Sequence, residues 1–434
     1  MATVAGCCII SRPVASNAQD IAGQNCKVKR STLCGRPTAL VCVLVLGRAP
    51  EVAAGSLAGR LHQFIDQNGF PTSHDFVEVV TPIVQRLALR GIDFPVTATT
   101  PSFSYRFNFD LGVPERTPES LGPAFAERAN TVGRHRFDLG VSYLYANLTR
   151  FDGADFGKQI LTAGVRTDPA TGLQAGGAFR GKRFSLMSHV MSFSATYGVT
   201  DRWDVNLLVP LVWTALRLDG VAAAQIIAGG SEAHLVAPAH FSGDAFGFGD
   251  VMLRTKYRFF DGPVKLASVI AVRVPSGDAR DFRGIGDPTV TPALIVSRAI
   301  RDHDVHASAG VEMNADDLQR TRARYAAGVT LQPWTRLACL LDLIGSSSFV
   351  DDEFTIPRPL HRSDQLFGND ELIESVGPTT VVARVPRSDV FDLAVGLKTS
   401  FFGSGAAFVS AIVPVTNDGL RAEVVPAAGV EVSF

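Results

Sequence analysis

The feature that most constrains this chain is a period-two alternation of apolar and polar residues, which recurs in twelve segments from residue 134 to the end. In the stretch Phe137–Tyr145 every second residue is large and apolar, and most of the residues between them are small or polar. This pattern is typical of a β-strand with one apolar and one polar face. The segments are 134–149, 187–199, 203–216, 248–260, 264–275, 288–300, 304–314, 321–332, 335–348, 389–401, 406–415 and 421–434.

The gaps between these segments alternate between long and short. The long positions are 150–186, 217–247, 276–287, 315–320, 349–388 and finally 416–420, and the short ones are 200–202, 261–263, 301–303, 333–334 and 402–405. Bacterial outer-membrane barrels have long outer loops, short periplasmic turns and an even number of strands. The pattern therefore predicts an all-β fold, a transmembrane antiparallel up-and-down β-barrel of about 12 strands over residues 131–434. If residues 102–128 add two strands, the barrel has 14.

Charge and hydropathy narrow the function classes. The chain has 41 Lys and Arg residues against 42 Asp and Glu residues, so it lacks the basic excess of a nucleic-acid-binding protein. Its mean hydropathy is +0.17, yet it contains no run of about 18 apolar residues that would make a transmembrane helix. Composition leaves a large soluble all-β protein or a membrane β-barrel, and the alternating gaps favour the barrel in the outer membrane of a Gram-negative bacterium.

The region before the barrel divides into two parts. Residues 1–54 are expected to be an export signal with a doubtful N-terminal extension, because a basic stretch, the short apolar run Ala39–Leu46 and the small-residue site Val52–Ala54 follow one another. Cleavage there leaves Cys339 as the one cysteine, which excludes an internal disulfide and a cysteine-based zinc site. Residues 55–130 are expected to be a helical and short-strand segment, with helices in 57–67 and 76–89, that forms a plug or a periplasmic piece.

Aromatic residues lie beside the short turns and at the chain end. Trp203 and Trp213 share a segment and are ten residues apart, which corresponds to ~33 Å along a strand and ~25 Å across a membrane after tilting. The last segment alternates and ends in Phe434, which resembles the signature that barrel-insertion machinery recognises. We expect contact with outer-membrane lipid through seven interface aromatics, namely Tyr197, Trp203, Trp213, Phe259, Trp334, Phe401 and Phe434.

Three stretches resemble a known family. They are Tyr197–Leu211, Phe246–Phe260 together with Val272–Asp278, and Val413–Phe434. They are similar to bacterial outer-membrane barrels that are called transporters and are related to the group labelled putative MetA-pathway of phenol degradation. The resemblance covers roughly residues 118–434. It implies an outer-membrane barrel that moves a small solute without a cofactor, and it does not identify that solute.

The parity of each segment assigns side chains to the barrel interior. The inward candidates are Asp204, Asp250, Arg254, Lys256, Arg258, Lys265, Arg273, Glu312, Asp342, Asp392, Lys398 and Glu431. As a pore wall, basic residues facing acidic strands would favour the passage of anions or dipolar solutes. Alternatively these charges pair with one another and fill the interior, because a barrel of 12 strands lies between filled and open sizes.

The function that these features favour is a passive or gated channel for small aromatic or apolar solutes. A first alternative is a non-transporting surface barrel whose loops 150–186, 217–247 and 349–388 bind a partner. A second is a lipid-modifying hydrolase that uses His306, Ser308 and Glu312, although parity points these side chains away from lipid. We expect no catalytic residue, metal, cofactor or nucleic-acid partner, and the sequence does not indicate the oligomeric state.

Overall fold

The structure is a computed structural model of the chain. It describes residues 55–67, 93–98, 102–103, 105–108, 113–116, 120–159, 161–167, 174–228, 231–357, 380–385 and 387–434. The predicted export signal and the predicted helix at 76–89 lie outside the described residues. Among the described residues, no helix has the length and apolar character needed to cross a membrane.

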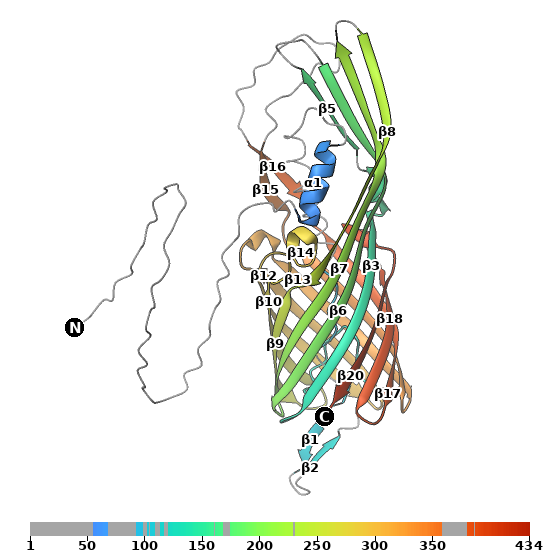
Figure 1. The fold of residues 1–434 in the computed structure, drawn as a ribbon. Coiled ribbons are helices and arrows are strands. Elements are labelled where there is room, and N and C mark those ends of the chain that lie inside the picture. Colours follow the sequence, from blue (N-terminus) through green and yellow to red (C-terminus); the bar gives the residue numbers. More distant parts are fainter. Residues whose placement is uncertain are drawn as a thin grey trace, which may run out of the picture. The chain divides into compact units, whose positions relative to one another are not determined.

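Twelve antiparallel strands form a closed barrel (Figure 1). They are β3 (Phe137–Phe151), β6 (Gln174–Thr200), β7 (Trp203–Ala228), β9 (Val251–Asp261), β10 (Lys265–Val274), β11 (Thr289–Ile300), β12 (His303–Asn314), β13 (Arg322–Trp334), β14 (Leu337–Ser348), β17 (Asp389–Phe401), β18 (Gly405–Pro414) and β20 (Val425–Ser433). The barrel closes at Val141 of β3, which pairs with Phe193 of β6 on one side and Val430 of β20 on the other. All twelve predicted segments are confirmed as strands.

The alternation in sequence becomes an alternation in exposure, with the apolar face outside. On β3 residue Leu139 is 45% exposed, whereas its neighbour Asp138 is only 6% exposed. On β9 Leu253 and Tyr257 are exposed, whereas Lys256 between them is buried. A barrel that exposes its apolar residues and buries its charges has the polarity expected of a protein surrounded by lipid.

Two of the predicted long loops are largely strand. Strands β6 and β7 continue as a paired ribbon as far as Gln174 and Ile227, and β5 (Leu161–Thr167) and β8 (Ser231–Phe248) pair with them. Figure 1 shows this ribbon extending past the rim of the barrel. The expectation of loops at 150–186 and 217–247 was wrong because these stretches are rich in Gly and Ala on both faces, which removes the period-two signal. Shorter elements of the outer region are β4 (Ala154–Asp155), α3 (Phe156–Gln159), η2 (Leu318–Arg320), β15 (Asp352–Pro357), β16 (Thr380–Val385) and β19 (Leu420–Ala422).

The N-terminal part contains one helix and one small hairpin among its described residues. Helix α1 (Leu57–Gln67) is confirmed where it was predicted. Strands β1 (Tyr105–Asn108) and β2 (Val113–Arg116) pair in a separate two-stranded sheet. The alternative of a barrel with 14 strands is therefore wrong, because this hairpin does not join the barrel sheet.

The loop after β10 folds back against the break between β8 and β9. It contains the short helix η1 (Ala279–Asp281). The Asp250 carboxylate at the break accepts the backbone N–H of Gly277 at 3.0 Å and of Ile285 at 2.8 Å. A Cβ atom on Gly284 would collide with the Asp250 carboxylate, so a larger residue here would displace that carboxylate from the two N–H groups. Two of the stretches that carry the family resemblance, 246–260 and 272–278, thus meet at one carboxylate.

Candidate functional site

Residues 93–98, 102–103 and 120–132, which we call the internal segment, lie inside the barrel and supply much of its apolar core. Leu121 and Val132 are fully buried, and Phe103 is 1% exposed. The ring of Phe125 packs edge-on against that of Phe408 on β18, with ring centroids 6.2 Å apart. Because these apolar side chains pack against the barrel wall, they occupy space that an empty pore would leave to water.

The predicted basic ladder of β9 and β10 contacts this internal segment. Lys256 Nζ lies 3.1 Å from Glu127 Oε2, and Arg254 Nη1 lies 3.5 Å from Glu127 Oε1. Lys256 also donates to the backbone carbonyl of Asn130, and Lys265 Nζ donates to the Asn130 side chain at 3.2 Å. The side chain of Lys256 is 3% exposed. The internal segment thus covers this part of the ladder.

The acidic candidates on the other strands hold the same segment through its backbone. Asp204 Oδ2 accepts the N–H of Val132 at 3.0 Å, and Asp342 Oδ2 accepts that of Phe125 at 3.2 Å. Glu431 Oε1 accepts the N–H of Ser102 at 2.7 Å and lies 3.4 Å from Lys398 Nζ. Lys398 in turn donates to the carbonyl of Pro123. Hydrogen bonds to charged groups are the stronger kind, so these contacts fix the segment in place.

The remaining candidates have partners elsewhere. Arg258 donates to the carbonyl of Asp201 and pairs with Asp261 at the periplasmic end predicted for this strand, whereas Asp392 pairs with Arg421. Asp250 holds the loop after β10, and Glu312 and Arg273 belong to the cluster described below. All twelve residues that were predicted to face inward are buried or half-buried in the structure. Their role as a pore lining stays a prediction.

The predicted interface aromatics point outward for the most part. The exposed ones are Trp203, Trp213, Phe259, Trp334 and Phe434, and the half-buried ones are Tyr197 and Phe401. The ring of Phe434 stacks on Phe137 of β3 with centroids 6.0 Å apart, which joins the last strand to the first. The position of these rings at a membrane interface stays a prediction.

Three cavities follow one another inside the barrel. Their volumes are about 350, 100 and 20 Å³. Residues Asp93, Phe94 and Pro95 line both the first and the second cavity, and Thr97 lines both the second and the third. The stretch 93–98, which lies in no helix or strand, therefore lies at the partitions between neighbouring cavities, to which Ile285 and Ser142 also contribute.

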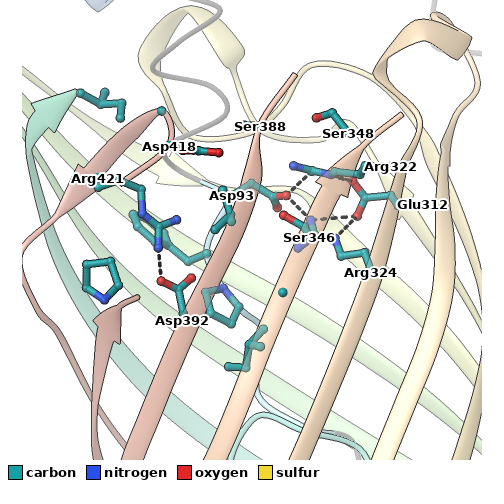
Figure 2. A pocket seen from close by; sticks show the side chains of 18 of the residues that line it. Asp93, Glu312, Arg322, Arg324, Ser346, Ser348, Ser388, Asp392, Asp418 and Arg421 are labelled. Carbon is teal, nitrogen blue, oxygen red and sulfur yellow. Dashed lines mark hydrogen bonds and ion pairs between the residues drawn. The ribbon is translucent and has the colours of Figure 1, made fainter. Parts of the chain in front are cut away.

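A cluster of five charged side chains stands at the first partition, and we call it the Asp93 cluster. Its members are Asp93, Arg273, Glu312, Arg322 and Arg324, and Figure 2 labels all of them except Arg273. Arg273 Nη1 lies 2.8 Å from Asp93 Oδ1, and Arg322 and Arg324 both pair with the other carboxylate oxygen of Asp93. Glu312 pairs with Arg322 at 2.6 Å and with Arg324 at 3.0 Å.

The Asp93 carboxylate is strongly held as an anion. Its side chain is 2% exposed. Burial by itself raises the pKa of Asp93, but the guanidinium groups of Arg273, Arg322 and Arg324 outweigh burial and hold that pKa well below the usual range of an aspartate. Asp93, Arg322 and Arg324 were not among the site residues predicted from the sequence. Parity within 321–332 would have assigned both arginines to the interior, whereas no periodicity marks Asp93.

The residues of the hydrolase alternative have separate partners. His306, which is 2% exposed, pairs through Nε2 with Asp342 Oδ1 at 3.3 Å. Glu312 is bound by Arg322 and Arg324 instead. The predicted arrangement of Glu312 orienting His306 is therefore not formed. Within the described part of the chain, no group of three or more metal-ligating side chains comes together.

Part of the barrel is similar to a known protein family. Residues 162–338 match the model of the family described as putative MetA-pathway of phenol degradation. The family resemblance is confirmed. No curated protein matches the chain significantly.

Solved structures of outer-membrane proteins are similar to this chain at low identity. An outer membrane channel from Pseudomonas putida F1 is 12% identical over 70% of this chain and 98% of its own, with a TM-score of 0.43. A toluene transporter from Ralstonia pickettii is 13% identical over 73% of this chain and 95% of its own, with a TM-score of 0.28. At these scores the likenesses carry no argument about the solute.

Proposed function

We propose that this chain is a gated outer-membrane channel for small solutes with aromatic or apolar bodies, and that its own N-terminal segment closes it. The observation that carries the proposal is the row of three cavities inside the barrel, which residues 93–98 divide. We assign residues 131–434 to the membrane barrel and residues 1–54 to export, and residues 55–130 supply most of the internal segment.

The placement in a membrane rests on the outward face of the barrel. Apolar side chains are exposed along the strands, and the charged side chains of the same strands are turned inward. Exposing this much apolar surface to water would cost about 25 cal/mol for each Å². Outer-membrane lipid removes that cost, and the barrel-insertion machinery is the expected partner that delivers the chain there.

Gating rests on the nature of the contacts that hold the segment. They are ion pairs and hydrogen bonds, such as those of Glu127 with Lys256 and of Asp204 with the Val132 N–H. Each such bond contributes a net of about 0.5–3 kcal/mol, so the segment as a whole is held firmly but reversibly. Its displacement would join the three cavities and leave the basic residues of β9 and β10 facing water.

The solute class rests on the lining of the largest cavity. One wall is apolar and consists of Leu148, Phe151, Ile412, Leu420 and Val425. A volume of about 350 Å³ lies in the range of ~300–1,000 Å³ that small-molecule sites occupy. The description of the matching family concerns the degradation of phenol, an aromatic compound.

Single-channel recording tests the proposal. Residues 55–434 are refolded in detergent and inserted in a planar bilayer as the unchanged chain, as Glu127→Gln and as the control Glu423→Gln. Glu127 bridges Lys256 and Arg254, whereas Glu423 forms an exposed pair with Arg150. We expect Glu127→Gln to open more often and the control to match the unchanged chain. A bilayer that stays sealed for all three proteins after verified insertion contradicts the proposal.

A second function is favoured by the ribbon of β5, β6, β7 and β8. This ribbon continues past the barrel rim and is therefore available to a partner outside the cell (Figure 1). If β6 and β7 are shortened to the barrel rim, the protein should no longer bind the partner, while the conductance of its channel should stay unchanged. Loss of conductance in such a variant contradicts a separate role for the ribbon.

A further inference from the structure

The Asp93 cluster carries more positive than negative charge. It brings together three arginines and two carboxylates, and the five side chains are between 2% and 25% exposed. With Asp93 removed, the three guanidinium groups would face Glu312, and Arg273 would also interact with the Asp250 carboxylate. Uncompensated charge in such a buried place is costly, so the arginines require a second anion at the position of the Asp93 carboxylate.

The geometry of these arginines suits a carboxylate. Arg322 donates to Glu312 through Nε and Nη2, and Arg324 donates to it through Nε and pairs with it through Nη2, so both planar groups contact the same carboxylate from β13. Both then present Nη2 to the same oxygen of Asp93. Arg273 contacts the other oxygen, and its buried Nε has no hydrogen-bond partner among the described residues. Planar guanidinium groups recognise a carboxylate through several parallel hydrogen bonds.

The largest cavity adjoins this set of donors. Glu312, Arg322 and Arg324 line one side of it, and apolar residues of β3, β18 and β20 line another (Figure 2). A molecule that placed a carboxylate at the arginines would therefore have room for an apolar body against Leu148 or Ile412. Asp93 itself belongs to the stretch 93–98, which is not anchored in a helix or strand.

We propose that Arg273, Arg322 and Arg324 form the binding site for a small carboxylate with an apolar or aromatic body, and that Asp93 occupies this site as an internal substitute while the channel is closed. The inference rests on the proposed channel function and names its solute class. An incoming carboxylate competes with Asp93 for the same donors. Its binding releases the stretch 93–98 from the barrel wall and thereby opens the first partition.

Benzoate is the probe, because it joins a carboxylate to an aromatic ring, and benzyl alcohol is the uncharged comparison. Binding is measured by calorimetry on the full mature chain in detergent, as the unchanged protein, Asp93→Asn, Asp93→Asn with Arg324→Gln, and the control Asp219→Asn. Asp219 pairs with His240 on the projecting ribbon, away from the cavity lining. Compact migration in unheated gels verifies that each variant is folded.

We expect Asp93→Asn to bind benzoate about tenfold or more tightly than the unchanged chain, because the internal competitor no longer reduces the population of the free site. Adding Arg324→Gln should remove that gain, and benzyl alcohol should bind all variants alike. Equal benzoate affinity for Asp93→Asn and the unchanged chain overturns the proposal. An equal gain for benzyl alcohol also overturns it, since the site would then recognise only the apolar body.

The same proteins in the bilayer keep the two proposals separable. If the unchanged chain conducts but benzoate affinity does not respond to Asp93→Asn, the channel stands and the carboxylate site fails. If benzoate binding responds as expected but no variant conducts, the site stands and the channel fails.

Discussion

Replacing Asp93 by Asn should shift the channel strongly toward its open state. The change keeps the size of the side chain but removes the negative charge that three arginines contact in the closed structure. Breaking a buried ion pair from one side costs about 3–5 kcal/mol. We take the lower value of about 3 kcal/mol, because the Arg324 side chain is 25% exposed and water screens part of the interaction.

This penalty falls on the closed state, since the open state leaves Asp93 and the arginines in water. At 1.4 kcal/mol for each factor of ten, about 3 kcal/mol lowers the ratio of closed to open channels roughly 100-fold. The assay is the fraction of time that single channels spend open in a planar bilayer. Asp219→Asn serves as the charge-matched control and should behave like the unchanged chain. An open fraction for Asp93→Asn within about threefold of the unchanged chain would refute the reasoning.

Other predictions concern pH, the loop after β10 and the lipid face. The pKa of Asp93 is lowered, so its stabilisation of the closed state is complete above the ordinary aspartate pKa of about 3.9 and is lost as pH falls toward the lowered value. The difference in open fraction between the unchanged chain and Asp93→Asn should accordingly stay constant from pH 8 to 5 and shrink only under strong acid; a loss near pH 6 would contradict this. Asp250→Ala leaves the N–H groups of Gly277 and Ile285 without their acceptor and should destabilise the barrel by about 2 kcal/mol or more, seen as a lower temperature of the gel-migration shift. Val141→Arg places a charge on the lipid face and should cost about 2–4 kcal/mol, whereas Val141→Ala should be mild; equal refolding yields in lipid vesicles would count against the outward assignment.

The barrel could be predicted from the sequence because lipid on one side of each strand and charged groups on the other impose a two-residue period. Leu139 and Asp138 show this directly, since neighbours on one strand differ in exposure from 45% to 6%. The ribbon beyond the rim could not be predicted, because its many Gly and Ala residues do not distinguish an apolar from a polar face. A strand without contrasting faces has no periodic signature, even when its backbone is fully paired.

The candidate site also contains residues that could be predicted from the sequence and one that could not. Glu312 and Arg273 were assigned to the interior from parity alone, and Arg322 and Arg324 obey the same rule in their segment. Asp93 lies about forty residues before the barrel in a stretch without periodicity, and its partners are 180 to 231 residues away along the chain. Only the three-dimensional path of the internal segment brings its carboxylate to the arginines, so no local pattern could have named it.

The most direct test of the central claim is the single-channel current of residues 55–434 under a salt gradient, recorded for the unchanged chain, Asp93→Asn and Arg254→Glu. We expect long closed periods in the unchanged chain, frequent openings in Asp93→Asn, and a preference for anions that Arg254→Glu weakens. A bilayer that remains sealed after verified insertion, or a pore that stays open in the unchanged chain, would contradict a channel closed by its own N-terminal segment.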